Sequence, residues 1–451
     1  MIGASRRFAG VASLAALSVA ACATTGEPPA TPLTVADTPT DARAPDGEYI
    51  SWREHRIDDE DLAGVPIRGG DGLQMADIDR DGFLDIVSVH EDSNHLRIAF
   101  GSADPDPWVL TTVAYGNIVG AIEDVAIGDL DGDGWPDLVS ANEEAHLAYF
   151  QNPGSQLAAR EGNWPSLIPP VTQGRGSWLR VFIADIDGDG RNDVIGANKG
   201  ASDIVDPDAP RADRTTSLFT IGGDPLNPDA WYEQVLLARD VPNTAMPVDI
   251  DADSDLDMLA AARLDQVAYI LENRGTGADG KVSIALHAIA IDDSALAGCS
   301  VATSAFQSAF RDLDGDGRLD LVTGVFEKCG DPRAPGGLPA LGWLQQPATL
   351  DQPWRYHRIG DILPDMVIAV ELADLDGDGD LDLLTTYQSW SSSYSNLIWI
   401  NYGSGPFSSS GRSLGIDGGG NGVVLGDLDS DGDLDILLLG SGANKVAFNI
   451  G

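Results

Sequence analysis

The nine residues Asp77-Ile78-Asp79-Arg80-Asp81-Gly82-Phe83-Leu84-Asp85 decide how this chain folds, because the same pattern recurs along it. Every copy reads D-x-D-x-D-[GS]-x-x-D, with Ile or Leu at position 2 and an aliphatic residue at position 10. The six further copies begin at Asp129, Asp185, Asp249, Asp312, Asp374 and Asp427. These seven segments, called aspartate loops 1 to 7 in chain order, indicate a chain built from repeated units.

The spacing of the aspartates predicts a metal site in each loop. Alternate carboxylates in a tight loop converge on one point, where they repel one another unless a cation neutralises them. Oxygen ligands in an irregular geometry suit Ca²⁺ better than Mg²⁺. We assign side-chain ligands to positions 1, 3, 5 and 9 and a backbone carbonyl to position 7. A solvated acidic turn is the competing interpretation, and sevenfold repetition of the same ligand positions favours calcium.

The predicted ligands are Asp77, Asp79, Asp81, Phe83 and Asp85 in loop 1; Asp129, Asp131, Asp133, Trp135 and Asp137 in loop 2; Asp185, Asp187, Asp189, Arg191 and Asp193 in loop 3; Asp249, Asp251, Asp253, Asp255 and Asp257 in loop 4; Asp312, Asp314, Asp316, Arg318 and Asp320 in loop 5; Asp374, Asp376, Asp378, Asp380 and Asp382 in loop 6; and Asp427, Asp429, Asp431, Asp433 and Asp435 in loop 7. The Gly at position 6 allows a sharp turn. Only loop 4 replaces that Gly, with Ser254, so we expect loop 4 to bind calcium most weakly.

The loops are not EF-hands, although they begin like one. An EF-hand needs a bidentate Glu at position 12 and flanking helices. Position 12 is never Glu here, and the loops lie between strand-like runs. Loop starts are separated by 52, 56, 64, 63, 62 and 53 residues, which is the period of propeller blades or solenoid units. Each period holds about four strand-like runs, the content of one propeller blade. The fold class we predict is therefore all-β.

Tryptophans open the outermost strand of most repeats. Trp108, Trp164, Trp231 and Trp354 lie 18 to 21 residues before the next loop. The segment 52–57, Trp-Arg-Glu-His-Arg-Ile, matches 354–359, Trp-Arg-Tyr-His-Arg-Ile. Residues 50–58 are thus predicted to form an outer strand that lies before the first complete repeat. The last repeat, by contrast, has no outer strand of its own. We expect the N-terminal strand to complete the last blade and close the ring, which removes an open sheet edge.

The loops between strand-like runs resemble the FG-GAP/VCBS repeats of bacterial secreted proteins and of the integrin α-subunit propeller. The resemblance covers residues 50–451. It implies a seven-bladed β-propeller with calcium in the hairpin between the two innermost strands of each blade. It does not imply one function, because propellers serve as binding proteins, scaffolds and enzymes.

The N-terminus predicts export. Residues 1–21 hold Arg6-Arg7 and a short apolar run, as in a secretory signal. Val19-Ala20-Ala21-Cys22 resembles the lipobox of bacterial lipoproteins, which implies lipidation of Cys22 and, since Ala23 rather than Asp follows, an anchor in the outer membrane. Cleavage after Ala23 and release is the alternative. Residues 22–48 are rich in Pro, Thr and Ala, and predict a disordered tether before the propeller at 49–451.

The net charge limits the kinds of binding partner, and the cysteines indicate a disulfide. The net charge of −44 disfavours nucleic acid, and it disfavours membrane contact other than through the lipid anchor. We expect a monomer. Of the three cysteines, Cys299 and Cys329 flank the hairpin of loop 5, so we expect a disulfide in an oxidising envelope. Two separate buried thiols are the alternative.

A ligand face is predicted at the end of each inner hairpin opposite its aspartate loop. Residues five and six positions past the last loop Asp reach that end. The predicted ligand-binding residues among them are His90, Glu91, Asn142, Glu143, Asn198, Lys199, Arg263, Tyr387 and Gln388. Polar groups that converge on a concave mouth suit a glycan or a protein ligand. Solvated strand ends are the alternative interpretation.

Three functions fit these features. The first is a surface-anchored, calcium-binding adhesion or binding module. The second is a carbohydrate-active lyase or dehydratase on a propeller, for which His90, Lys199, Arg263 and Tyr387 are the candidate acid, base and charge-stabilising residues. The third is an envelope assembly scaffold. Motifs for a nucleophile elbow, a phosphate loop, H-E-x-x-H and C-x-x-C do not occur in the sequence.

Overall fold

The computed structural model describes residues 33–34, 52–144, 146–200, 214–239, 241–263, 266–306, 308–329, 337–361, 366–375, 379–388, 397–399, 407, 412–413, 422–439 and 443–449. The predicted signal segment, Cys22 and the predicted tether other than residues 33–34 lie outside these residues. In the described part of the chain, no helix is both long enough and apolar enough to span a membrane.

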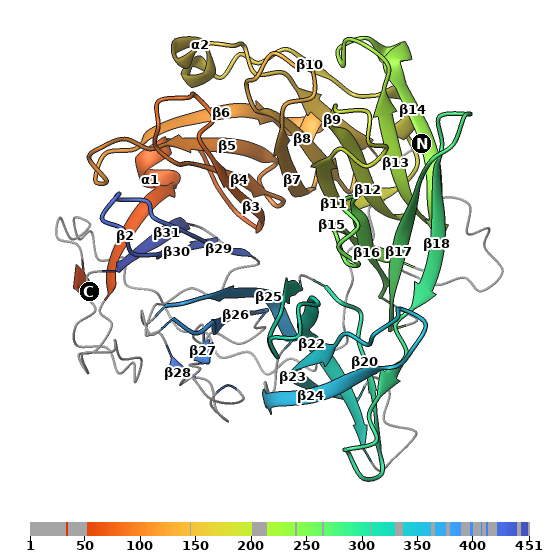
Figure 1. Cartoon of the computed structure of the whole chain (residues 1–451). Helices are drawn as coiled ribbons and strands as arrows, with labels where there is room; N and C mark the ends of the chain where they lie inside the picture. The colour runs from red at the N-terminus through yellow and green to blue at the C-terminus, as the bar shows by residue number, and fades with distance from the viewer. Residues whose placement is uncertain are drawn as a thin grey trace, which may run out of the picture. The chain divides into compact units, whose positions relative to one another are not determined.

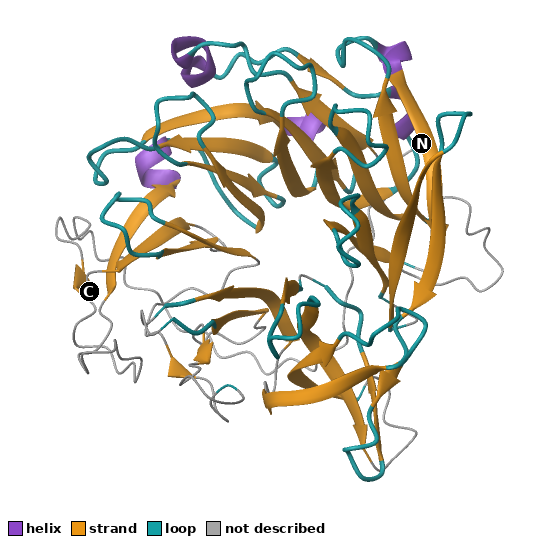
Figure 2. Ribbon diagram, viewed as in Figure 1, coloured by secondary structure: helices purple, strands orange, loops and turns teal. Residues whose placement is uncertain are grey.

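The described chain is almost entirely antiparallel β-structure, arranged in seven sheets that we number in chain order (Figures 1 and 2). Sheet 1 contains β3 (Gly70–Ala76), β4 (Asp85–His90), β5 (His95–Phe100) and β6 (Val109–Tyr115). Sheet 2 contains β7 (Ile122–Gly128), β8 (Asp137–Asn142), β9 (His146–Phe150) and β10 (Ser166–Leu167). Sheet 3 contains β11 (Ser177–Ala184), β12 (Asp193–Gly200), β13 (Thr215–Ile221) and β14 (Trp231–Ala238). Sheet 4 contains β15 (Pro242–Val248), β16 (Asp257–Ala262), β17 (Val267–Thr276) and β18 (Val282–Ala288).

The remaining sheets follow the same plan with additions. Sheet 5 contains β20 (Cys299–Ala302), β21 (Ala309–Arg311), β22 (Asp320–Cys329), β23 (Leu338–Gln345), β24 (Trp354–Asp361) and β19 (Ile291–Asp292), which pairs parallel to β24. Sheet 6 contains β25 (Met366–Ala373), β26 (Asp382–Gln388), β27 (Leu397–Trp399) and β28 (Arg412–Ser413). Sheet 7 contains β29 (Gly422–Gly426), β30 (Asp435–Leu439), β31 (Ala443–Asn449), β2 (Trp52–Asp59) and β1 (Leu33–Thr34). The all-β class is confirmed.

Helices among the described residues are short. They are α1 (Glu60–Ala63), α2 (Gln156–Glu161) and the 3-10 turns Gly116–Val119, Pro170–Thr172 and Pro228–Ala230. Ser155 caps the N-terminus of α2 by accepting a hydrogen bond from the Ala158 amide at 3.4 Å, and Gly162 ends the helix in a left-handed conformation.

Each aspartate loop is the turn between the first two strands of its sheet, or between β21 and β22 in sheet 5. In sheet 1, Ala76 pairs with Asp85 across loop 1. The first strands of sheets 1 to 4 contact one another in turn, as do those of sheets 5, 6 and 7, and β29 of sheet 7 contacts β3 of sheet 1. Sheets 4 and 5 share a cluster of buried apolar side chains that includes Val248 and Phe310. The loops therefore lie in the hairpins nearest the centre of this set of sheets, as the FG-GAP resemblance implies.

Hydrophobic clusters join each sheet to the next. Val87 and Val125, for example, share a cluster between sheets 1 and 2. Leu73 and Leu437 share another between sheets 1 and 7. The packing thus runs through all seven sheets and returns to the first, because the pleated strands expose apolar side chains on both faces of each sheet.

The N-terminal strand completes the last sheet. β2 pairs antiparallel with β31 from Trp52↔Asn449 to Asp59↔Ala443. The Trp52 side chain is fully buried between sheets 6 and 7. β1, in the segment predicted as tether, adds two residues beyond β2. Cys299 and Cys329 pair opposite one another in β20 and β22 and form a disulfide, as expected.

Candidate metal centres and ligand face

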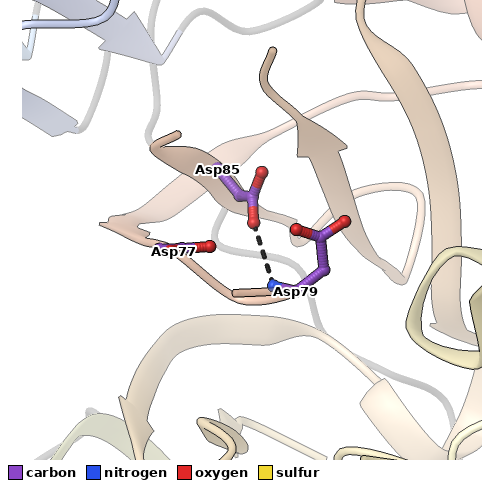
Figure 3. A group of neighbouring side chains, drawn as sticks. All are labelled: Asp77, Asp79 and Asp85. Carbon is purple, nitrogen blue, oxygen red and sulfur yellow. Dashed lines mark hydrogen bonds between the residues drawn. The ribbon is translucent and has the colours of Figure 1, made fainter. Parts of the chain in front are cut away.

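Carboxylates from positions 1, 3 and 9 gather in the aspartate loops (Figure 3). In loop 1, one oxygen each from Asp77, Asp79 and Asp85 lies within 4.8 Å of the other two. The same holds in loops 2, 3 and 4 for Asp129, Asp131 and Asp137; for Asp185, Asp187 and Asp193; and for Asp249, Asp251 and Asp257. Three of the four predicted side-chain positions are therefore close enough together to bind one cation.

The position-9 aspartate also holds the hairpin together. In all seven loops its Oδ2 accepts a hydrogen bond from the position-2 amide at 2.7–3.1 Å. In loops 1, 2, 4 and 5 its Oδ1 accepts a second bond from a backbone amide at or after the third strand, such as that of Gly101 at 2.8 Å from Asp85. Burial raises the pKa of Asp85, Asp137 and Asp193 to about 7 and that of Asp257 and Asp320 to about 6.

Positions 1 and 5 shape the turn. Oδ2 of position 1 accepts a hydrogen bond from the position-6 amide in all seven loops, at 2.8–3.3 Å. Oδ1 of position 5 accepts one from the position-7 amide in loops 1 to 5 and 7, at 2.8–3.1 Å. Position 5 is not a member of the four groups described above. The ligand roles of position 5 and of the position-7 carbonyls stay predictions, and Asp376 and Asp378 lie outside the described residues.

The loops contain buried oxygen atoms that fit a cation. Oδ1 of Asp79, Asp249, Asp374 and Asp429, all at positions 1 or 3, is buried without a hydrogen-bond partner. A buried carboxylate oxygen without a partner is costly, and a bound hard cation would remove that cost. Oδ1 of Asp255, for which the sequence predicted only a backbone role, is in the same situation. The residues present therefore fit Ca²⁺, which would neutralise and order the loops when bound.

Protein side chains satisfy other loop oxygens. Arg160 reaches from α2 to loop 1 of sheet 1, where it pairs with Asp79 and, at 2.8 Å, with Asp81. Arg191 pairs with Asp189 at 2.9 Å in loop 3, and Arg318 pairs with Asp316 in loop 5. The loops consequently differ in how much negative charge they leave for a metal, a difference that the repeated motif does not reveal.

Two positions have left-handed backbone in each loop that is described at both of them. Position 6 has φ of +80° in Ser254 and is Gly in the other loops. Position 4 also has positive φ, and it is Arg80, Ala252 or Ser430 in loops 1, 4 and 7. Among the loops whose positions 4 and 6 are both described, only loop 4 lacks Gly at both. The backbone strain expected for loop 4 is therefore larger than Ser254 alone indicated.

Comparison with known proteins identifies the repeats. The model of the family described as "FG-GAP-like repeat" matches residues 77–140, 129–196 and 374–438, and each match begins at the first Asp of a loop. Over these residues the chain contains FG-GAP-like repeats. Two similar solved structures are "Crystal structure of BBS1N in complex with ARL6DN, soaked with lead" and the same complex soaked with mercury, with TM-scores of 0.47 and 0.46. Both are 12% identical to this chain and cover 88% of it and 97% of their own chain. No curated protein matches the chain.

Part of the predicted ligand face comes together in the structure. Oxygens of Glu91, Glu143 and a third carboxylate, Glu123, lie within 4.8 Å of one another. Lys199 of sheet 3 pairs with Glu143 of sheet 2. Glu91 follows β4 at the end opposite Asp85, which places this cluster about 20 Å from loop 1 along the strand. We call Glu91, Glu123, Glu143 and Lys199 the mouth cluster.

The other predicted ligand residues are not members of the mouth cluster. His90 is buried in its sheet, with Nε2 3.1 Å from Ser88 Oγ, and burial lowers its pKa to about 3. Asn142 is buried and donates to the His146 carbonyl at 3.1 Å, while Asn198 donates to the Arg175 carbonyl at 3.2 Å. Arg263 is exposed. The side chains of Tyr387 and Gln388, at the end of β26, are outside the described set, so their role stays a prediction.

A central cavity of about 210 Å³ adjoins the mouth cluster. Its walls come from the first strands of six sheets and, in sheet 5, from Ser308 just before β21. Arg180 lies in it, with Nη1 3.4 Å from the Glu123 carbonyl oxygen and 3.7 Å from Asp124 Oδ1. Burial raises the pKa of Asp124 to about 6 and that of Glu371 to about 7. Sequence reasoning missed these residues, because an acidic residue within an inner strand has no distinguishing local pattern.

Proposed function

We propose that this protein is a calcium-stabilised binding module of the bacterial cell envelope, anchored through lipid on Cys22 and contacting a protein ligand at the mouth cluster. The observation that carries the proposal is the meeting of Glu91, Glu123 and Glu143 with Lys199 at one point. These residues come from three different sheets, so they meet only in the folded chain. Because propellers serve as binding proteins, scaffolds and enzymes, the proposal rests on these residues and not on the fold.

The charge of the site selects the kind of ligand. Three carboxylates face one ammonium group in the mouth cluster, and the adjoining cavity holds Asp124 and Glu371 beside Arg180. An excess of carboxylates attracts a basic ligand and repels an anionic one, since complementary charge raises the association rate and suppresses wrong partners. A protein that presents Lys or Arg side chains therefore fits the mouth.

The enzyme alternative is less well supported. The four candidate catalytic residues belong to four different sheets, with His90 in sheet 1, Lys199 in sheet 3, Arg263 in sheet 4 and Tyr387 in sheet 6. His90 is buried and Lys199 is paired with Glu143, whereas Arg263 is exposed. General acid–base chemistry needs such groups within hydrogen-bond reach of one substrate.

A site-directed cross-linking experiment tests the proposal. A photoreactive amino acid replaces Glu143 in one variant and the exposed Tyr232 of β14 in a control, both in cells that make the full chain. We expect one partner protein to cross-link from position 143 only and to be lost at high salt or in the Glu91→Gln/Glu123→Gln double variant. Equal labelling from both positions, or labelling that the double variant leaves unchanged, would contradict the proposal.

The anchor has its own test. Cys22→Ser should abolish incorporation of a clickable fatty acid and move the protein from the membrane fraction to the soluble fraction of the envelope. Thr24 follows the lipobox and takes no part in it, so a Thr24→Ser variant should remain lipidated. Persistent fatty-acid labelling of the Cys22→Ser variant would refute the anchor.

A further inference from the structure

A cavity of about 570 Å³ lies between the outer parts of sheets 1 and 2, and its lining includes no residue of the aspartate loops or the mouth cluster. It exists because the fourth strand of sheet 2, β10, has two residues, whereas its counterpart in sheet 1, β6, has seven. The chain between β9 and β10 instead forms α2, which contacts β6 (Figure 1). A volume of this size matches the clefts that hold small ligands.

The cavity wall is held against β6 by specific contacts. Thr111 Oγ1 donates a hydrogen bond to the Arg160 carbonyl of α2 at 2.8 Å. Gly162 has φ of +75°, and a Cβ at this position would lie 2.5 Å from the Thr112 carbonyl oxygen. Only glycine permits this approach. The segment therefore covers the middle of β6, so an added peptide strand cannot pair along that edge.

Aromatic rings line the cavity in fixed positions. Tyr115, at the end of β6, is 73% exposed and stacks on His95, with ring centroids 6.3 Å apart and an interplanar angle of 23°. Trp164 is buried and anchored, because its Nε1 donates to the Ala159 carbonyl at 3.0 Å. Phe150 forms part of the same wall. A large, exposed aromatic ring with a packed support offers a flat apolar face at little entropic cost.

Polar groups at the rim are available to a ligand. Glu161, Asn163 and Ser166 line the cavity and are exposed. Among the residues that the structure describes, their side chains have no hydrogen-bond or ion-pair partner. They supply a carboxylate, an amide and a hydroxyl to the same cavity as the Tyr115 ring.

We infer that this cavity, the outer cleft, binds a neutral glycan, with a sugar ring stacked on Tyr115 and its hydroxyls bonded to Asn163, Glu161 and Ser166. A pyranose has an apolar face of C–H groups and an equatorial rim of hydroxyls, which matches an aromatic floor with amide and carboxylate neighbours. Glu161 and the net charge of −44 disfavour polyuronates and other anionic chains. The outer cleft is a site distinct from the mouth and extends the proposed function from one ligand to two.

Calorimetric titration of the calcium-loaded full chain tests the inference, with the trisaccharides cellotriose, maltotriose, laminaritriose and chitotriose as probes. We expect at least one probe to bind. Tyr115→Ala should weaken that binding by about tenfold or more, since stacking and burial are both lost, whereas Tyr115→Phe should retain most of it. Asn163→Ala should weaken binding as well.

Two controls separate the outer cleft from other surfaces. Tyr232→Ala removes another exposed tyrosine, 59% exposed on β14, and should leave sugar affinity unchanged. Glu123→Gln alters the mouth cluster and should also leave it unchanged, so failure at the mouth and failure here are distinguishable. The inference is overturned if no probe binds, if Tyr115→Ala binds like Tyr232→Ala, if Glu123→Gln alone abolishes binding, or if a trigalacturonate binds more tightly than the neutral probes.

Discussion

The side-chain amide of Asn273 in sheet 4 donates a hydrogen bond at 2.8 Å to the carbonyl oxygen of Ile186 in the aspartate loop of sheet 3. Its backbone amide bonds Asp257 of its own sheet at 2.7 Å. Asn152 makes the same two bonds: its side chain donates to the Ile78 carbonyl of loop 1, and its backbone amide donates to Asp137. The side chain of Gln346 donates to the Ile250 carbonyl of loop 4, and its backbone amide donates to Asp320. These amides tie one loop to the next sheet.

Removing the amide of Asn273 should lower stability. Asn273→Ala leaves the buried Ile186 carbonyl without its donor, and a buried polar group left unpaired costs about 1–3 kcal/mol. We expect a lower melting temperature and a lower midpoint in urea, measured by circular dichroism. Asn117→Ala, at an exposed site without hydrogen-bond or ion-pair partners among the described residues, is the matched control. Equal melting of the two variants would argue against a role for the amide link.

Removing calcium should also lower stability. An occupied site stabilises the fold by about 2.7 kcal/mol when free calcium exceeds the dissociation constant a hundredfold. Protein freed of metal by a chelator, and checked by elemental analysis, should melt at a lower temperature, and added Ca²⁺ should restore the midpoint better than Mg²⁺. A melting curve that does not respond to chelation would count against calcium in the loops.

The pH dependence of stability should change sign with calcium. In the metal-free protein, burial raises the pKa of Asp85, Asp137 and Asp193 to about 7, above the ordinary 3.8. Between these values the folded state holds protons that the unfolded chain has released, so the free energy of unfolding falls as pH rises. Metal-free protein should thus melt higher near pH 5 than near pH 8. With saturating calcium the trend should reverse, because the ligands bind as carboxylates. Parallel trends in both states would contradict this prediction.

Loop 4 should gain most from glycine. Ser254 adopts φ of +80° and Ala252 adopts +61°, a region that costs non-glycine residues energy. Ser254→Gly should raise the calcium affinity of loop 4 and the stability of the loaded protein by about 0.5–1 kcal/mol, relief of strain outweighing the entropy that glycine adds to the unfolded chain. The reverse change in loop 1, Gly82→Ser, should lower the calcium affinity of loop 1 and the stability of the loaded protein. Unchanged melting and calcium titration for both variants would show that turn strain does not limit binding.

Deleting residues 50–58 should open an edge of sheet 7. β2 pairs with β31 and contributes Trp52 and Ile57, both buried, to the clusters on either side of the sheet. Loss of these contacts exposes strand β31 and invites association between molecules. We expect aggregation or a large drop in melting temperature by light scattering and calorimetry. Deleting residues 23–45 removes only β1 of the described structure. This deletion should cause neither aggregation nor a large drop in melting temperature. Similar behaviour of the two truncations would refute closure by the N-terminal strand.

The local features were predictable because they are encoded in short spacings. Four aspartates at fixed positions meet through one turn, and the alternation of apolar residues marks the strands on either side. Trp231 and Trp354 open β14 and β24 as expected. Residues 52–57 resemble residues 354–359, and this resemblance predicted that β2 is an outer strand. The reason is that equivalent strands in repeated sheets need equivalent side chains.

What the sequence by itself determined is thus the repeat, the all-β class and the aspartate loops, and it favoured the pairing of Cys299 with Cys329. Only the tertiary structure decided which groups from different repeats meet. They are Arg160 at loop 1, Asn273 at Ile186, Glu123 with Glu91 and Glu143, and Tyr115 with Asn163 in the outer cleft. The reason is physical. Contacts within a hairpin follow from strand and turn geometry a few residues long, whereas contacts between sheets depend on how seven units pack, and packing leaves no fixed spacing in the chain.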